Sequence, residues 1–161
     1  MKALLVRIDD RLIHGQVVVG WTRSAGVTCI LVVDDKTAGD KIQCSLMRLA
    51  TPAGLRTEFL TIEGAADKIA SGDYQGEHIM ILVKGPGTII SLLDKGVEIL
   101  GLNIGNLRSA PEKIKLLSHV YATAEEIEEW KELDRRGVKM SAQILPDQAK
   151  TDFNQVIKKG C

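Results

Sequence analysis

Short apolar runs alternate along the chain with segments in which apolar residues recur every three or four positions. A short unbroken apolar run predicts a strand, usually one that is covered on both faces of its sheet. Seven such strands are expected, at residues 3–8, 27–33, 55–62, 78–83, 99–104, 119–122 and 138–145. The periodic segments between and after them predict helices.

These helices are expected at residues 15–25, 40–50, 64–70, 86–96, 123–136 and 153–158. In the second of them, Ile42, Leu46 and Leu49 fall on one helical face. Thr123 and Glu126 form the T-x-x-E pattern of a capping box, which marks the start of a helix.

Alternating strands and helices build βαβ units around a mostly parallel sheet. The expected fold class is therefore α/β, an open three-layer αβα sandwich with a mostly parallel sheet of about seven strands. No internal repeat, low-complexity tract or linker interrupts the pattern. Residues 1–161 are expected to form one domain, in agreement with the usual length of a domain.

Composition narrows the classes of function without naming an activity. Basic and acidic residues number 21 each, whereas a nucleic-acid-binding protein usually carries a basic excess. The chain has no run of about 20 apolar residues that would predict a transmembrane helix, and its N-terminus lacks a signal-peptide pattern. Cys29, Cys44 and Cys161 are far apart and have no zinc-binding spacing. A reduced, cytoplasmic protein is expected.

The carboxyl ends of parallel strands gather the functional loops of such a sheet. These are residues 9–15, 34–40, 84–88 and 103–111. The first of them, within RIDDRLIHGQ at residues 7–16, carries His14, the only histidine between a predicted strand and a predicted helix.

Each part of this loop suits phosphoryl transfer. A neutral imidazole nitrogen of His14 is available as a nucleophile near pH 7. A helix N-terminus at Gly15 offers free amides to an anion, and Arg11 has the planar geometry that holds phosphate oxygens. Asp9 or Asp10 would orient the ring or the arginine. The residues alone leave a second interpretation open, in which His14 is a solvated loop residue and the charges only cap the helix.

The motif RIDDRLIHGQV at residues 7–17, followed by Trp21, resembles the phosphorylation-site signature of the enzyme IIB components of the mannose/fructose/sorbose family of the bacterial sugar phosphotransferase system (PTS). The resemblance covers roughly residues 1–158. It continues in VVDD at 32–35, DKIQCSLMRLATPAG at 40–54, LVK at 82–84, LLDKGVEI at 92–99, LNIGN at 102–106 and ELDRRGVKMSAQILP at 132–146. One departure is NIGN at 103–106, where many members have NVGG, and Asn106 is expected to tolerate a left-handed backbone.

The resemblance implies a protein-phosphohistidine–sugar phosphotransferase. His14 would accept a phosphoryl group, by resemblance on Nδ1, from a phosphohistidine of the IIA component. It would pass the group to a sugar held by the membrane components IIC and IID, so that any membrane contact is through partners. The expected site residues are His14, Arg11 and Asp10 for catalysis, and Arg7, Gly15, Gln16 and Lys84 for phosphate binding. No metal, cofactor or nucleic acid is implied, and a homo-oligomer stays open.

Three other classes of protein are alternatives to this assignment. A nucleotide-binding domain lacks support because the chain has neither G-x-G-x-x-G nor a P-loop pattern. A phospho-aspartate receiver would use Asp34 or Asp35 with Lys84, yet its acceptor should end the third strand, where residues 61–63 are Thr-Ile-Glu. A non-catalytic regulatory relative would not need His14 and Arg11.

Several residues also have a plainly structural interpretation. Asp34 and Asp35 suit a helix cap or a turn. Trp21 suits a core anchor, and His78 and His119 suit structural positions. Asn103 and Gly105 are expected to shape the edge of the site.

Overall fold

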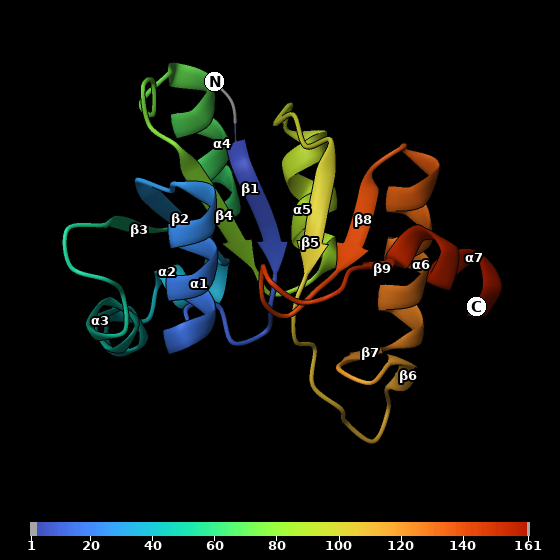
Figure 1. The fold of residues 1–161 in the computed structure, drawn as a ribbon. Coiled ribbons are helices and arrows are strands. Elements are labelled where there is room, and N and C mark those ends of the chain that lie inside the picture. Colours follow the sequence, from blue (N-terminus) through green and yellow to red (C-terminus); the bar gives the residue numbers. More distant parts are fainter. Residues whose placement is uncertain (1–2, 161) are drawn as a thin grey trace.

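The computed structural model describes residues 3–160, which form a seven-stranded sheet with the strand order β3-β2-β4-β1-β5-β8-β9 (Figure 1). Every pairing in it is parallel except that of β9 with β8. The strands are β1 (Ala3–Ile8), β2 (Cys29–Val33), β3 (Arg56–Leu60), β4 (Ile79–Val83), β5 (Gly101–Ile104), β8 (Lys139–Ala142) and β9 (Thr151–Asp152). The expected α/β class and mostly parallel sheet are confirmed.

Helices follow most of the strands, as the periodicity predicts. They are α1 (Gly15–Ala25), α2 (Asp35–Ala38), α3 (Lys41–Leu49), α4 (Ile62–Ser71), α5 (Pro86–Asp94), α6 (Ala124–Arg135) and α7 (Phe153–Gly160). The short α2 was not expected from the sequence. The capping box is confirmed, because the Thr123 hydroxyl accepts from the amide of Glu126 and the Glu126 carboxylate accepts from the amide of Thr123.

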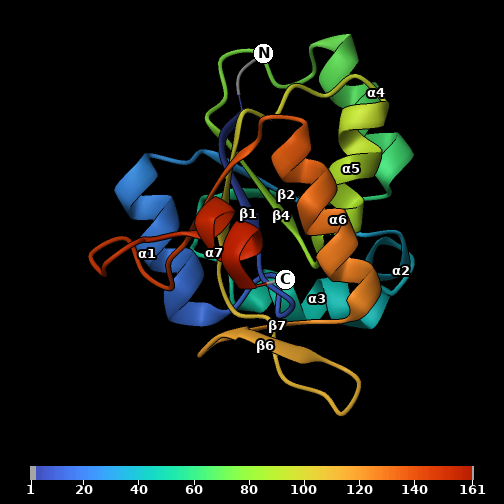
Figure 2. The same ribbon diagram turned by 90° about the vertical axis from the view of Figure 1, so that its right-hand side faces the viewer.

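Two apolar clusters hold the layers together, one on each face of the sheet. The larger one joins the sheet to α4, α5, α6 and α7, with Trp130 packed edge-on against Phe153. The smaller one joins β2 and β4 to α1 and to the loop before it. Figure 2 shows α1 on one side of the sheet and α4, α5 and α6 on the other. All residues of β2 and β4 are buried, as expected for strands covered on both faces.

The layer on the α1 side is incomplete. In β5 and β8 only alternate residues join the larger cluster, among them Leu102, Ile104, Met140 and Ala142. The residues between them point to the opposite face, because successive side chains of a strand alternate. That face of β5 and β8 lies beyond α1, so the layer on the α1 side does not extend over these two strands.

The expected strand at residues 119–122 is not part of the main sheet. Its residues form β7 (Val120–Ala122), which pairs antiparallel with β6 (Ile114–Leu117) in a separate hairpin. The hairpin lies beyond the carboxyl ends of the strands (Figure 1). The seventh strand of the sheet is instead the two-residue β9, which an apolar run does not mark because both of its residues are exposed.

Helix α3 exposes the apolar face that its sequence pattern predicts. Ile42, Leu46 and Leu49 are 74%, 54% and 84% exposed. The helix contacts the smaller cluster through Met47 instead. Among residues 3–160, no helix is long and apolar enough to span a membrane.

Candidate functional site

The loop that carries His14 leaves the carboxyl end of β1, a central strand that lies between β4 and β5. Backbone hydrogen bonds fix the loop to both neighbours. The amide of Asp9 donates to the carbonyl of Val83 at 3.0 Å, and the amide of Gly105 donates to the carbonyl of Ile8 at 2.7 Å. The loops that follow β4 and β5 therefore flank the His14 loop, as the sheet topology predicts.

His14 is the N-cap residue of α1, and its side chain is exposed. Its carbonyl accepts from the amide of Val17 at 3.0 Å, which fixes the backbone, while the ring has no hydrogen-bond partner among the described residues. The amides in the first turn of a helix have no helical acceptor, and no acidic residue lies in this first turn. Gly15, at φ +27°, and Gln16 are exposed beside the ring. A free imidazole thus sits at an electropositive helix end.

The loop is held in a strained conformation by its own apolar residues. Leu12 has φ +57°, in the left-handed region that only glycine adopts freely, and its side chain is 1% exposed. Leu12 and Ile13 belong to the smaller apolar cluster together with Val17. Burial of these side chains offsets a backbone strain of about 1–3 kcal/mol and fixes where His14 emerges.

Asp9 is the acceptor at the centre of the loop. Its carboxylate is 1% exposed and accepts from Arg11 through the backbone amide at 3.1 Å, Nε at 3.0 Å and Nη2 at 3.0 Å. It also accepts from the amide of Asn106 at 3.2 Å. These bonds orient Arg11, whose side chain is 27% exposed and retains a further nitrogen, Nη1, for an anion. Of the two aspartates, Asp9 is therefore the one that orients the arginine.

The expected direct contact of Arg7 with phosphate is not what the structure shows. Arg7 is completely buried beneath the loop, between the ring of Trp21 at 4.9 Å and the Asp9 carboxylate at 3.6 Å. Its Nη1 donates to Asn103 and to the carbonyl of Gln143, and its Nη2 donates to the carbonyl of Ile144. Trp21 lies in the core as expected. Arg7 is thus a fixed cation under the site.

Burial lowers the pKa of Arg7 to about 10, with Asp9 opposing the shift and Arg11 adding to it. The guanidinium therefore stays charged near neutral pH. Its Nε is buried without a hydrogen-bond partner among the described residues.

Gly105 makes room for this buried pair. A Cβ atom at this position would contact the Arg7 guanidinium and lie 2.6 Å from Asp9 Oδ2. The next residue, Asn106, is not required to adopt the left-handed backbone that it was expected to tolerate, since Leu12 is the only non-glycine residue described with positive φ. Asn106 instead donates its side-chain amide to Asp10 at 3.4 Å.

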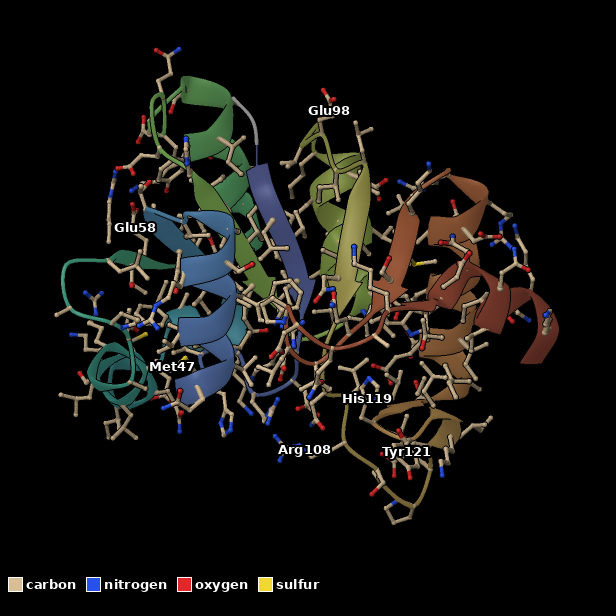
Figure 3. The ribbon with its side chains drawn as sticks, viewed as in Figure 1. Met47, Glu58, Glu98, Arg108, His119 and Tyr121 are labelled. Atoms are coloured by element: carbon tan, nitrogen blue, oxygen red, sulfur yellow. The ribbon has the colours of Figure 1, made fainter. Side chains whose placement is uncertain are left out.

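Asp10 does not hydrogen-bond to the histidine ring or to the arginine that it was expected to orient. Its carboxylate accepts from the Arg108 backbone amide at 2.8 Å and from Arg108 Nε at 3.2 Å. It has no hydrogen bond to His14 or Arg11, so it joins the His14 loop to the loop after β5. Figure 3 shows Arg108 projecting at the carboxyl edge near His119.

Lys84 lies at the end of β4, where its ammonium is 3.5 Å from Asp34 Oδ2. Asp34 is the N-cap of α2 and accepts from the amide of Thr37 at 3.0 Å and from its hydroxyl at 2.6 Å. Burial tends to raise the pKa of Asp34, but these bonds and Lys84 lower it below its ordinary value. The helix-cap interpretation of Asp34 is confirmed, and Asp35 accepts from the amide of Ile62 at 2.8 Å.

Sequence reasoning missed three participants in this site. The carbonyls of Gln143 and Ile144 hold Arg7, and Arg108 holds Asp10. A polar residue, Gln143, within an apolar strand segment was the available signal for the first two. Residues 3–160 contain no group of three or more histidine, cysteine, aspartate or glutamate side chains arranged to hold a metal ion.

The end of β3 carries no aspartate that could accept a phosphoryl group as in a receiver domain. Thr61 follows that strand and uses its hydroxyl to cap α4, accepting from the amide of Gly64 at 3.0 Å.

Comparison with known proteins points to one family. The model of the PTS system sorbose subfamily IIB component matches residues 3–160. The PTS system fructose-specific EIIB component of Bacillus subtilis (strain 168) is 31% identical over 158 residues, 98% of this chain and 97% of that protein. The PTS system mannose-specific EIIAB component of Escherichia coli (strain K12) is 30% identical over 96% of this chain, which spans 48% of that longer protein.

A solved structure agrees with these relatives. The crystal structure of the IIBSor domain of the sorbose permease from Klebsiella pneumoniae superposes with a TM-score of 0.94 at 30% identity. The superposition covers 100% of this chain and 99% of that one.

Proposed function

The chain belongs to the PTS system sorbose subfamily IIB components, and we propose that it carries a phosphoryl group on His14 from a IIA protein to a sugar. The observation that carries this proposal is the exposed imidazole of His14, free of partners among the described residues, at the N-terminus of α1. Next to it lies the Arg7–Asp9–Arg11 cluster, in which Arg7 and Asp9 are buried and Arg11 is partly exposed.

The chemistry proceeds as two displacements at phosphorus. In the first, the lone pair of a neutral His14 nitrogen, which we assign to Nδ1, forms an N–P bond while the N–P bond of the donor phosphohistidine breaks. In the second, a sugar hydroxyl oxygen forms an O–P bond and releases its proton to the surrounding water, while the N–P bond to His14 breaks and its electron pair returns to the imidazole nitrogen. Catalysis of such transfers is mostly positioning and electrostatic stabilisation, which arginine side chains and helix amides can supply.

Each proposed site residue has a part that its position supports. Arg11 offers Nη1 to the phosphoryl oxygens while Asp9 holds its other nitrogens. The amides of Gly15 and Gln16 face the same group at the helix end. Arg7 contributes its charge from below, and Asp10 acts by fixing the two loops together. Lys84 adds a positive charge at the end of the neighbouring strand.

The family and the names of relatives support the proposed partners. The E. coli relative is named an EIIAB component, which supports a IIA protein as the phosphoryl donor. We propose that the acceptor sugar is held by the membrane components IIC and IID, with the transfer on the cytoplasmic side. Relatives are named for different sugars, among them fructose and mannose, so the acceptor is proposed only as a sugar hydroxyl.

Incubation with a phosphorylated IIA protein tests the proposal. The phosphoprotein formed should survive alkali and lose its phosphate in acid, as a phosphohistidine does. His14→Ala should abolish phosphate acceptance, and the matched control His78→Ala, at an exposed position away from the loop, should not. An alkali-labile product, or normal acceptance by His14→Ala, would overturn the assignment.

A further inference from the structure

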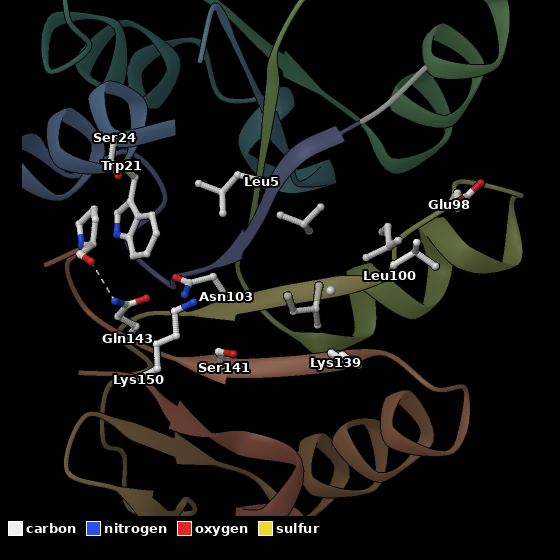
Figure 4. A pocket seen from close by; sticks show the side chains of 15 residues that line it. Leu5, Trp21, Ser24, Glu98, Leu100, Asn103, Lys139, Ser141, Gln143 and Lys150 are labelled. Carbon is white, nitrogen blue, oxygen red and sulfur yellow. Dashed lines mark hydrogen bonds between the residues drawn. The ribbon is translucent and has the colours of Figure 1, made fainter. Parts of the chain in front are cut away.

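A groove of about 930 Å³ lies outside the proposed phosphorylation site. It lies over β1, β5 and β8 on the face that no helix covers, between α1 and the segment after β8 (Figure 4). The lining residues that matter below are Trp21, Gly101, Asn103, Lys139, Ser141 and Lys150.

The strand pattern builds a polar floor for this groove. In the register of β5 and β8, Gly101 lies beside Lys139 and Asn103 lies beside Ser141. Side chains that are paired in this way project from the same face of the sheet. The floor therefore carries one ammonium, one amide and one hydroxyl, and Gly101 keeps it deep because it has no side chain.

The groove carries an excess of positive charge. Lys139 and Lys150 are exposed, and neither forms an ion pair within residues 3–160. Figure 4 shows the Lys150 side chain running toward Asn103, whereas Glu98, the only acidic side chain among the described residues that line the groove, lies at the far end. Asp152 is next to Ser141 in register, but its carboxylate accepts from the amide of Gln155 at 3.3 Å.

Asn103 connects the groove to the phosphorylation loop. Its side-chain oxygen accepts from buried Arg7, while its amide nitrogen has no partner among the described residues. A ligand that accepts a hydrogen bond from this nitrogen would therefore contact the same side chain that holds the Arg7 guanidinium beneath the His14 loop.

We propose that this groove binds the phosphorylated sugar that the transfer produces, with its phosphate at Lys139, Lys150 and Ser141. Two ammonium groups match a phosphomonoester dianion, and the Asn103 amide and the Ser141 hydroxyl match sugar hydroxyls. The volume falls within the range of small-molecule sites, roughly 300–1,000 Å³. A nucleotide fits less well, because Trp21 is 8% exposed and Arg7 occupies its ring face. The choice of ligand rests on the proposed function, while the site itself rests on the groove.

Binding to the unphosphorylated protein tests this proposal independently of any phosphoryl transfer. Fructose 6-phosphate, inorganic phosphate and fructose are titrated separately, and amide chemical shifts are followed by NMR. Saturable shifts at Asn103, Ser141 and Lys150 are expected with fructose 6-phosphate, with weaker binding of inorganic phosphate and weakest binding of fructose. His14→Ala should bind equally well, so failure of the transfer proposal would leave this result unchanged.

Three variants locate the ligand. Lys150→Ala should weaken binding about tenfold, since one charge-assisted hydrogen bond is lost, and Lys150→Arg should restore most of it. Gly101→Val should block binding by filling the floor without removing a charge, because a Cβ there meets only the Lys139 carbonyl at 3.5 Å. Lys115→Ala, at an exposed lysine on β6, is the matched control and should bind normally.

Two results would overturn the proposal. The groove is not a phosphate site if none of the probes saturates, or if Lys150→Ala and Gly101→Val bind as the unaltered protein does. Equal affinity for fructose 6-phosphate and inorganic phosphate would exclude the sugar contacts at Asn103.

Discussion

The guanidinium of Arg11 donates two parallel hydrogen bonds to the carboxylate of Asp9, Nε to Oδ1 and Nη2 to Oδ2, each at 3.0 Å. Such a paired contact fixes both the position and the plane of the arginine. Because the same carboxylate lies 3.6 Å from buried Arg7, one aspartate pairs with two cations, leaves a net positive charge, and sets the geometry beside His14.

Removing Asp9 should destabilise the fold strongly. Asp9→Ala leaves Arg7 buried without its counter-charge, and breaking a buried pair typically costs about 3–5 kcal/mol. The measurement is the free energy of unfolding in urea. Glu128→Ala is the control, since it breaks an exposed surface pair with Lys131 and should cost at most about 1 kcal/mol. Similar losses in the two variants would show that Arg7 does not depend on Asp9.

Arg11 should matter more for transfer than for stability. Arg11→Ala removes the only arginine of the His14 loop that reaches the surface, and loss of one such donor slows related reactions by roughly 10²–10³. Arg11→Lys keeps the charge but loses the paired geometry, so it should recover only part of the rate. The rate of phosphoryl acceptance is measured by rapid quench, with Arg23→Ala, an exposed arginine of α1, as the control. An unchanged rate in Arg11→Ala would exclude this role.

Gly105 should tolerate no side chain. Gly105→Ala places a Cβ 2.6 Å from Asp9 Oδ2 and against the Arg7 guanidinium, so the buried pair must shift. Overpacking of this kind costs about 1–3 kcal/mol, and the transfer rate should fall with it. Gly39→Ala is the matched control, because its Cβ would meet the Lys36 carbonyl only at an ordinary 3.7 Å. Equal stability of the two variants in thermal unfolding would contradict the close packing.

His119 should make stability depend on pH. Burial lowers its pKa below the ordinary value, and Arg7 lowers it further against the opposing effect of Asp9. Its Nε2 is buried without a partner among the described residues. Below about pH 6.5, the unfolded chain therefore binds a proton that the folded protein resists, and the free energy of unfolding falls as the pH drops.

Urea unfolding at a series of pH values measures this slope. His119→Gln should flatten it between about pH 6.5 and the lower folded pKa, because glutamine does not titrate in this range. His78→Gln, at an exposed position, should leave the slope as it is. An unchanged slope in His119→Gln would mean that another group controls the acid response.

Local patterns predicted most of the elements and the loop that carries His14. The strand at residues 3–8, the helix at 15–25 and the capping box at Thr123 each depend on residues close together in the chain. The hydrophobic pattern also predicted the apolar face of α3. It could not predict that Ile42 and Leu49 are exposed, because exposure depends on whether another element packs against that face.

The site residues that were missed depend on contacts distant in sequence. Arg7 is buried because residues 103, 143 and 144 supply acceptors from β5 and from the end of β8. No local pattern in RIDDRLIHGQ distinguishes a buried arginine from a surface one. Apolar and polar residues alternate in LNI of β5 and KMSA of β8, which is consistent with one exposed face on each strand. That the two faces are adjacent and lie beyond α1 depends on the strand order, which the local sequence does not reveal.

Phosphoryl transfer through His14 is tested by locating the phosphoryl group on the protein after incubation with phosphorylated IIA. The protein is digested under alkaline conditions, which preserve a phosphohistidine, and the peptide spanning residues 12–23 is sequenced by tandem mass spectrometry. We expect the phosphoryl group on His14 and on no other residue. A phosphoryl group on an aspartate, or on His78 or His119, would contradict it.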